Sequence, residues 1–310
     1  MQYRRIGKSG LKVSEMGLGA NSFGGRANEA DSISTIRLAL ESGVNFIDTA
    51  DAYAGGRSEE VVGKAVRGRR SQVIIATKFG NPRTVAPHQQ WGSRGFITDA
   101  VNASLKRLST DYIDLYYIHR PDPATPIEET LRTLDDVVRA GKVRYIGCSN
   151  FAAWQLNDAL WTSRVGHLES FIAVESRYNL LDRNIESQLV PCCQAHDIGV
   201  IPWYPLAAGF LTGKYQRGKP PPAGTRLTDP HSSLKTLLTD ANYDKLEKLQ
   251  AFAAERSHGV GELAVAWLLS RPWVSSVIAG ARNTGQLSAN VAAMAWKLTA
   301  EDVLQLDKLF

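Results

Sequence analysis

Short apolar runs alternate with amphipathic stretches along almost the whole chain. The apolar runs cover residues 16–20, 44–48, 73–78, 113–119, 143–149, 171–175, 199–203 and 274–280. Helical periodicity falls between them, at residues 30–42, 58–67, 95–108, 127–140, 152–162, 184–196, 243–270 (interrupted near Gly259 and Gly261) and 284–293. Such alternation is typical of βαβ units with parallel strands. Eight units predict an α/β fold of the TIM-barrel type, a (β/α)8 barrel, with a doubly wound sheet as the alternative.

Two segments lie outside the eight units. The opening YRRIGKSGLKVSEMG has a Lys-Ser-Gly turn between short strand-like arms, which predicts a β-hairpin that caps the floor of the barrel. The tail LTAEDVLQLDKLF predicts a last helix with Thr299 as its N-cap and acidic residues in its first turn. We therefore interpret residues 1–310 as a single barrel domain.

Two predicted loops are long, and each follows a predicted strand. They cover residues 80–95 and 208–236 and are rich in glycine and proline. Long loops in a compact domain are usually functional or disordered. In barrel enzymes the loops after the strands form the active-site face, so we expect the chemistry there.

Composition excludes several classes of protein. No run reaches the roughly 18 uncharged apolar residues of a membrane span, and the start MQYRRIGKSG lacks the apolar core of a secretory signal. These features predict a cytoplasmic protein without a membrane partner. The net charge is +5, but the basic residues are spread along the chain, and no aromatic-rich nucleic-acid-binding motif accompanies them. No nucleic-acid partner is therefore expected. Cys148, Cys192 and Cys193 fit neither a disulfide framework nor a metal site and are interpreted as buried thiols.

Polar residues end three neighbouring apolar runs. VNFID ends in Asp48, VIIATK in Lys78 and IDLYYIH in His119, and Tyr53 lies in the loop after the first run. Because the carboxyl ends of barrel strands meet at one face, we expect the four side chains to converge. Each alone has a structural alternative: a helix cap, a solvated lysine, a core histidine or a packed tyrosine. The four together favour a functional site.

An acid, an amine, an imidazole and a phenol suit the reduction of a carbonyl. A phenol has an ordinary pKa of about 10, and Lys78, anchored by Asp48, would lower that pKa. Tyr53 would then be the general acid for a developing alkoxide, while His119 would orient and polarise the carbonyl. The hydride must come from a cofactor. The stretch GLGANSFGG (17–25) does not fit the dinucleotide pattern G-x-G-x-x-G, because Ser22 takes the place of the third glycine.

Eight segments, several of which contain the residues named above, are spread over nearly the whole chain and match a known family. They are NFIDTADAY, GRSEEVVGKAV, VIIATKFG, SLKRLSTDYIDLYYIHRPD, GKVRYIGCSNF, RYNLLDR, PLAAGFLTGKY and AGARNTGQLSANV. With them the chain resembles an aldo-keto reductase. The resemblance implies hydride transfer from NADPH, with NADH as the alternative, to a small aldehyde or ketone. It also implies that the family's catalytic tetrad is Asp48, Tyr53, Lys78 and His119.

The resemblance further implies a set of cofactor-binding residues. These are Ser149, Asn150 and Glu175 at the carboxamide, Trp203 on the nicotinamide, Leu206, Gly209, Thr212 and Lys214 along the pyrophosphate, and Gly280, Arg282, Gln286 and Asn290 at the adenosine end. Trp203 stands where the family usually has a tyrosine, and Glu175 where it usually has a glutamine. An acid at this position can still accept the N–H of the amide but cannot donate, and its charge near the nicotinamide would favour the oxidised, positive ring. Arg282 could contact a 2′-phosphate in a bidentate manner, which favours NADPH.

The substrate and the partners are less determined. Trp91, Arg94 and Arg120 are the candidate substrate residues, with a packed indole and solvated loop charges as the structural alternative. Arginines at the mouth would favour acidic or sugar-like carbonyl compounds. A cofactor-sensing binding protein of the channel β-subunit type is the first alternative function. A barrel hydrolase or isomerase is the second, although the strand ends show neither a metal cluster nor paired catalytic carboxylates.

Overall fold

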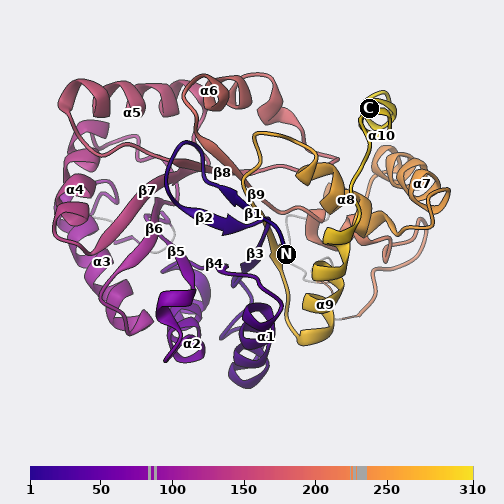
Figure 1. Cartoon of the computed structure of the whole chain (residues 1–310), viewed down its shortest axis with the longest axis horizontal. Helices are drawn as coiled ribbons and strands as arrows, with labels where there is room; N and C mark the ends of the chain where they lie inside the picture. The colour runs from indigo at the N-terminus through magenta and orange to yellow at the C-terminus, as the bar shows by residue number, and fades with distance from the viewer. Residues whose placement is uncertain (83–84, 87–88, 224, 226–227, 229–235, 310) are drawn as a thin grey trace.

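Eight parallel strands close into a barrel surrounded by helices (Figure 1). The computed structural model describes residues 1–82, 85–86, 89–223, 225, 228 and 236–309. The barrel strands are β3 (Met16–Gly19), β4 (Phe46–Asp48), β5 (Ile74–Phe79), β6 (Ile113–Ile118), β7 (Val143–Ser149), β8 (Ala173–Arg177), β9 (Gly199–Trp203) and β10 (Val277–Gly280). Strand β10 pairs with both β3 and β9, which closes the sheet. The (β/α)8 prediction is therefore confirmed, and the doubly wound sheet is excluded.

The helices follow the predicted periodic segments with one clear difference. They are α1 (Glu29–Glu41), α2 (Arg57–Ala65), α3 (Arg94–Leu108), α4 (Ile127–Arg139), α5 (Ala153–Gly166), α6 (Leu189–Ala195), α7 (Asp240–Ala254), α8 (Val260–Leu269), α9 (Thr284–Ala292) and α10 (Ala300–Asp307). The predicted helix over 184–196 is wrong in its first half, where a 3-10 turn, η3 (Asn184–Glu186), precedes α6. Pro191 has no main-chain N–H and is tolerated only in the first turn of a helix, which explains a start near Leu189.

Alternating residues of the strands fill the barrel or contact the helices. On β6, Leu115 and Tyr117 pack inside the barrel, and Tyr116 and Ile118 belong to the outer core under the helices. Gly147 on the neighbouring strand makes room for this arrangement, because a Cβ there would lie 2.6 Å from the Tyr117 ring. Close packing of this kind leaves no pore and confines the open space to the barrel ends.

The N-terminal hairpin closes one end of the barrel. Strands β1 (Tyr3–Arg5) and β2 (Lys12–Ser14) pair antiparallel. Ile6, Leu11 and Val13 are buried among the residues of the barrel interior. The main-chain N–H of Lys8 donates to the oxygen of Asp197, just before β9 begins. Because this is the amino end of the strands, the predicted cap on the barrel floor is confirmed.

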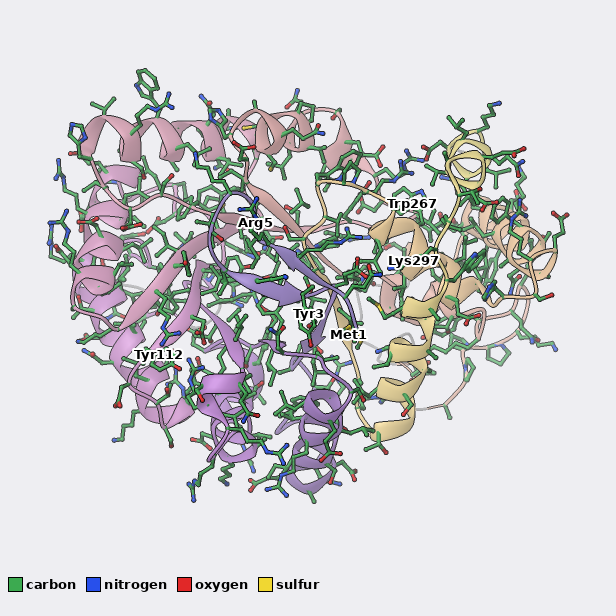
Figure 2. The ribbon with its side chains drawn as sticks, viewed as in Figure 1. Met1, Tyr3, Arg5, Tyr112, Trp267 and Lys297 are labelled. Carbon is green, nitrogen blue, oxygen red and sulfur yellow. The ribbon has the colours of Figure 1, made fainter. Side chains whose placement is uncertain are left out.

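The C-terminal segment returns to the hairpin. Lys297, labelled in Figure 2, and Arg4 both form ion pairs with Glu15, at 2.8 and 2.6 Å. The last helix starts as predicted, because the Thr299 hydroxyl accepts a hydrogen bond from the N–H of Asp302 at 3.1 Å. Among the described residues, no helix combines the length and the apolar character that crossing a membrane requires.

The long predicted loops follow β5 and β9 at the opposite end of the barrel from the hairpin. Residues 83–84, 87–88, 224, 226–227 and 229–235 of these loops lie outside the described ranges. The described part of the second loop begins with a 3-10 turn, η4 (Ala207–Thr212). This end of the barrel is where the polar residues of the strands gather.

Candidate active site

Four strands deliver polar side chains to the carboxyl end of the barrel. Asp48 is the last residue of β4, Lys78 the penultimate residue of β5, and Glu175 lies in β8. His119 directly follows β6, and its main-chain N–H donates to the oxygen of Phe79 at 2.7 Å. The structure thus brings together the strand-end residues that the sequence singled out.

Lys78 is fully buried, and its ammonium is surrounded by oxygen atoms. The Nζ atom lies 2.7 and 2.6 Å from the two carboxylate oxygens of Asp48 and 3.0 Å from the main-chain oxygen of Thr49. It also lies 3.3 Å from Oε2 of Glu175. Burial acts to lower the pKa of Lys78, but the attraction of Asp48 and Glu175 outweighs burial and raises it. The ammonium therefore stays charged without contact with solvent.

Tyr53 reaches this cluster from the loop after β4. It begins a 3-10 turn, η1 (Tyr53–Gly56), in which Ala54 has the left-handed φ of 51°. Its ring centroid lies 5.2 Å from Nζ of Lys78. Burial raises the pKa of the phenol above its usual value, and Asp48 and Glu175 add to this effect, while Lys78 opposes it. The net pKa is thus raised rather than lowered, because burial outweighs the ammonium.

The His119 imidazole lies next to the phenol in its neutral form. The two rings meet edge to face, with 6.0 Å between their centroids and 81° between their planes. Burial, together with the nearby charges of Lys78 and Arg120, lowers the pKa of His119 to about 3. Its Nδ1 atom is buried and has no hydrogen-bond partner within the described chain.

These side chains face a cavity of about 580 Å³. Lys78 lies behind its wall, whereas the other predicted catalytic residues line it directly. All the predicted cofactor residues also line it: Ser149, Asn150, Glu175, Trp203, Leu206, Gly209, Thr212, Lys214, Gly280, Arg282, Gln286 and Asn290. The cavity therefore runs from the Lys78 cluster across the ends of β7 to β10 to the start of α9.

The part of the cavity nearest the cluster offers amide and indole groups. Asn150 has a left-handed φ of 61°, and its Nδ2 donates to the oxygen of His119 at 3.0 Å and to the Ser149 hydroxyl at 2.9 Å. Trp203 ends β9, and its Nε1 has no hydrogen-bond partner in the described structure. A flat ring with a carboxamide could stack on this indole and bind the amide groups beside it.

The far part of the cavity offers cations and a helix start. Gly209 has φ +87°, and a Cβ there would lie 2.5 Å from Nζ of Lys214, so the lysine covers this glycine closely. At the start of α9, Asn283 caps the helix, and the N–H of Arg282 donates to Oε1 of Gln286 at 2.9 Å. Cations beside a helix N-terminus favour phosphate groups. The lining therefore offers the amide, indole and cationic groups that a nicotinamide dinucleotide would need.

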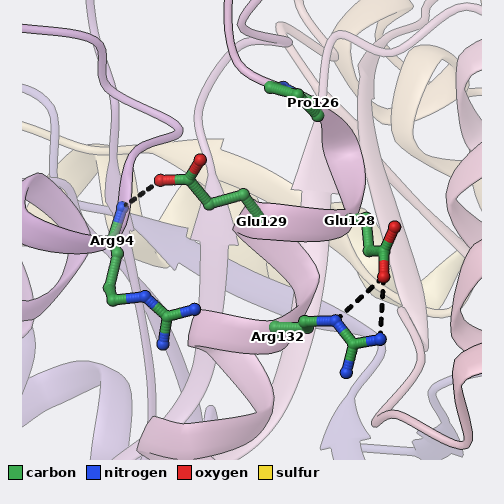
Figure 3. Close-up of a pocket in the computed structure, with 5 residues that line it drawn as sticks. All are labelled: Arg94, Pro126, Glu128, Glu129 and Arg132. Carbon is green, nitrogen blue, oxygen red and sulfur yellow. Dashed lines mark hydrogen bonds and ion pairs between the residues drawn. The ribbon is translucent and has the colours of Figure 1, made fainter.

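The three candidate substrate residues are placed differently. Arg120 lines the cavity. Trp91 does not line it, but its Nε1 donates to the main-chain oxygen of Arg120 at 3.0 Å. Arg94 starts α3 and lies in a separate surface cleft, where Glu129 accepts a hydrogen bond from its main-chain N–H (Figure 3). Its guanidinium pairs with Asp136 at 3.1 Å, so the structure does not bring Arg94 to the cavity.

Sequence reasoning missed part of the lining. Gly19, Asn21 and Ser22 face the cavity after β3, in the stretch considered only as a failed dinucleotide pattern. The available signal was the one that indicated Asp48: polar residues directly after an apolar run. Asp51, outside the lining, is half-buried, and desolvation and the nearby Glu59 raise its pKa to about 7. In the part of the chain that the structure describes, no cluster of three or more metal-ligating side chains is found.

Comparison with known proteins identifies relatives along the whole chain. The model of the family described as Aldo/keto reductase family matches residues 15–310. A "Probable voltage-gated potassium channel subunit beta" of Arabidopsis thaliana is 39% identical over 302 residues, covering 95% of this chain and 91% of that protein. "Aldo-keto reductase YhdN" of Bacillus subtilis is 38% identical over 312 residues, covering 97% and 91%. "Versiconal hemiacetal acetate reductase" of Aspergillus parasiticus is 33% identical over 339 residues, covering 99% and 96%.

Proposed function

Because the chain belongs to the aldo/keto reductase family, we propose that it transfers a hydride between a nicotinamide coenzyme and the carbonyl carbon of an aldehyde or ketone. One observation carries the proposal: Tyr53, His119 and Asp48 line one cavity, and Lys78, paired with Asp48, lies directly behind its wall. A proton donor and a polar partner for the same oxygen atom are what carbonyl reduction requires.

Tyr53 is the proton donor in this proposal. Its raised pKa keeps the phenol protonated at neutral pH, so a proton is available for the alkoxide that forms from the carbonyl. The ammonium of Lys78, 5.2 Å from the ring, stabilises the phenolate left after transfer. Asp48 holds that ammonium with both oxygens and acts as a positioning residue.

His119 orients the carbonyl in this proposal. With its pKa lowered to about 3, the imidazole is neutral at all pH values at which the protein is expected to work. A neutral imidazole can donate one N–H to the carbonyl oxygen without placing a second full positive charge near Lys78. Its contact with Asn150 through the main-chain oxygen fixes its place beside the phenol.

The coenzyme supplies the hydride, and the proposed coenzyme is NADPH, with NADH as the alternative. Ser149, Asn150 and Trp203 would hold the nicotinamide end. Lys214 and Arg282 would hold the phosphates. Arg282 lies just before the start of α9, whose N-terminal N–H groups also favour a phosphate. Arg282 is the residue proposed to distinguish the 2′-phosphate of NADPH from the hydroxyl of NADH.

The experiment begins with the coenzyme. Binding of NADPH and NADH is followed by tryptophan fluorescence, since Trp203 lines the cavity, and turnover is then measured with a panel of small aldehydes. Tyr53→Phe should lower kcat by about 10²- to 10⁴-fold, the usual contribution of a general acid, and leave the coenzyme Kd unchanged. Tyr204→Phe, which removes the buried hydroxyl of another tyrosine that lines the cavity, is the matched control and should retain turnover. Normal turnover of Tyr53→Phe would refute its assignment as the acid, and failure to bind either coenzyme would refute the reductase.

A second candidate function follows from the Arabidopsis relative, whose name is that of a channel subunit. In this alternative the chain binds the coenzyme and docks on a channel, and its turnover is too slow to matter. Coenzyme that stays bound through gel filtration, together with no turnover on any aldehyde of the panel, would favour this function. Multiple turnovers with a low KM would favour the reductase.

A further inference from the structure

Four oxygen atoms lie within 3.3 Å of the Lys78 ammonium, which has only three N–H donors. Both oxygens of Asp48 and the main-chain oxygen of Thr49, all within 3.0 Å, can take up these three donors. Glu175 Oε2 is the fourth oxygen, at 3.3 Å, and within the described chain it has no hydrogen-bond partner. Its 3.3 Å contact is the longest of the four, so Glu175 is the oxygen that the ammonium binds least closely.

The charge balance of the buried cluster indicates that Glu175 carries a proton. Only 2% of this residue is exposed, and its sheet partners, Ser149 on β7 and Ile201 on β9, carry no charge. With two carboxylates and one ammonium, the buried cluster would have a net charge of −1. With a proton on Glu175 it would be neutral. Burial favours the neutral arrangement, since an uncompensated buried charge is costly.

The remaining titratable groups around Glu175 do not change this balance. Burial and the charge of Asp48 raise the pKa of Glu175 to about 8, against the opposing effect of Lys78. Tyr53 and Tyr117, the phenols whose ionisation Glu175 affects, have pKa values raised above 10 by burial and are neutral. Burial also raises the pKa of Asp48, but both of its oxygens are bonded to Lys78 at 2.7 and 2.6 Å, whereas Glu175 lies at 3.3 Å. We therefore assign the proton that the two carboxyls release near neutral pH to Glu175.

We propose that Glu175 selects between the two redox states of the coenzyme through its own proton, an inference that rests on the proposed reductase function. In the protonated form its carboxyl can both donate and accept a hydrogen bond, as an amide does. In the ionised form it places a negative charge in the cavity, which attracts the positively charged oxidised nicotinamide and not the neutral reduced one. The sequence-based expectation that Glu175 cannot donate applies only to the ionised form.

The linkage is reciprocal. If ionisation of Glu175 strengthens binding of the oxidised coenzyme, then binding of the oxidised coenzyme must promote ionisation of Glu175 by the same factor. Binding NADP⁺ near pH 7.5 should therefore release a proton from the protein, and binding NADPH should not. The proton leaves the Glu175 carboxyl for the solvent, and no covalent bond of the coenzyme changes.

The test compares affinities across pH. The Kd values of NADP⁺ and NADPH are measured by tryptophan fluorescence from pH 6 to pH 9.5 in the wild type and in Glu175→Gln. The 2′-phosphate is common to both forms, so its titration cancels in the ratio of the two Kd values. In the wild type, the preference for NADP⁺ should rise at least fivefold through about pH 8, the low end of typical coupling between linked sites. In Glu175→Gln the ratio should not change with pH.

Two results would overturn the inference. One is a wild-type ratio that is independent of pH, and the other is an equal rise in Glu175→Gln. Asp51→Asn is the control, because Asp51 also has a raised pKa, of about 7, but lies outside the cavity lining. This variant should keep the rise.

A second measurement needs no variant. Wild-type protein in weakly buffered solution at pH 7.5 is saturated with NADP⁺ or NADPH, and an indicator dye reports released protons. Equal release with both forms overturns the role of Glu175, even though both coenzymes bind. Binding of neither coenzyme is a different result, because it overturns the proposed reductase and this inference together.

Discussion

Replacing Glu175 with glutamine should make the stability of the coenzyme-free protein less sensitive to pH. Glutamine has nearly the shape of a protonated glutamate, so the packing around Lys78 is retained. The substitution removes only the ability of this side chain to lose a proton and become charged at high pH. We therefore expect the wild type and Glu175→Gln to be similarly stable near pH 5 and the variant to be more stable at pH 8 to 9.

The sign and the size follow from the pKa of Glu175. Below its ordinary value of 4.5, the carboxyl is protonated in both the folded and the unfolded chain. As the pH rises from 4.5 to about 8, the unfolded chain loses this proton and the folded protein keeps it, so the free energy of unfolding falls. At about 1.4 kcal/mol per pH unit, the loss reaches up to about 5 kcal/mol. The share that belongs to Glu175 is absent from the variant, whereas Asp48, whose pKa burial also raises, keeps its own share.

The assay is urea unfolding of both proteins at one-unit steps from pH 5 to pH 9, without coenzyme. Glu15→Gln is a control of opposite sign. Burial acts to raise the pKa of Glu15, but its ion pairs with Lys297 and Arg4 outweigh burial and lower it. Its contribution is fully present above its ordinary pKa of 4.5 and is lost only below it, so between pH 5 and pH 9 Glu15→Gln should be destabilised by a nearly constant amount. A difference between wild type and Glu175→Gln that does not change with pH would refute the reasoning.

Three further predictions concern the cations of the site. Lys78→Met leaves Asp48 and Glu175 buried without a counter-charge and should lower the free energy of unfolding at pH 8 by about 3–5 kcal/mol; wild-type stability in urea would contradict the ion-pair argument. Arg282→Ala should weaken NADPH by at least tenfold, a loss of about 1.5–3 kcal/mol for a charge-assisted contact, and change NADH little; equal losses in fluorescence titrations would mean that Arg282 does not contact the 2′-phosphate. Arg120→Ala should raise KM for carboxylated aldehydes but not for uncharged ones of equal size, and an unchanged ratio of the two KM values would remove Arg120 from substrate binding.

The strand-end residues could be predicted because their signal is local. Asp48, Lys78 and His119 each follow several apolar residues, and parallel strands of a closed barrel must end at the same face. Tyr53 was found by its place in the following loop. The same local signal was present in MGLGANS, where Asn21 and Ser22 follow β3, and it could have predicted that part of the lining.

Side-chain direction and protonation could not be predicted in the same way. Arg94 is a candidate substrate residue in the sequence, with a solvated charge as the alternative, and in the structure it is the first residue of α3 and pairs with Asp136 from α4. The pKa of Tyr53 was expected to be lowered by Lys78, but the effect of burial, which depends on every neighbour, is larger. The state of Glu175 likewise depends on which oxygens already occupy the protons of Lys78.

A lysine that is fully buried stays charged only if a carboxylate lies beside it. Asp48 provides that carboxylate, and both of its oxygens accept hydrogen bonds from Lys78. A second ionised carboxylate at 3.3 Å adds to the attraction on Lys78 but gives the buried cluster a net charge of −1. Glu175 is tolerated because it can keep its proton, and it keeps that proton only as long as no further positive charge arrives. An oxidised nicotinamide, the proposed occupant of the cavity that Glu175 lines, would be such a charge. The arrangement that maintains Lys78 for proton transfer therefore makes Glu175 responsive to the redox state of the coenzyme.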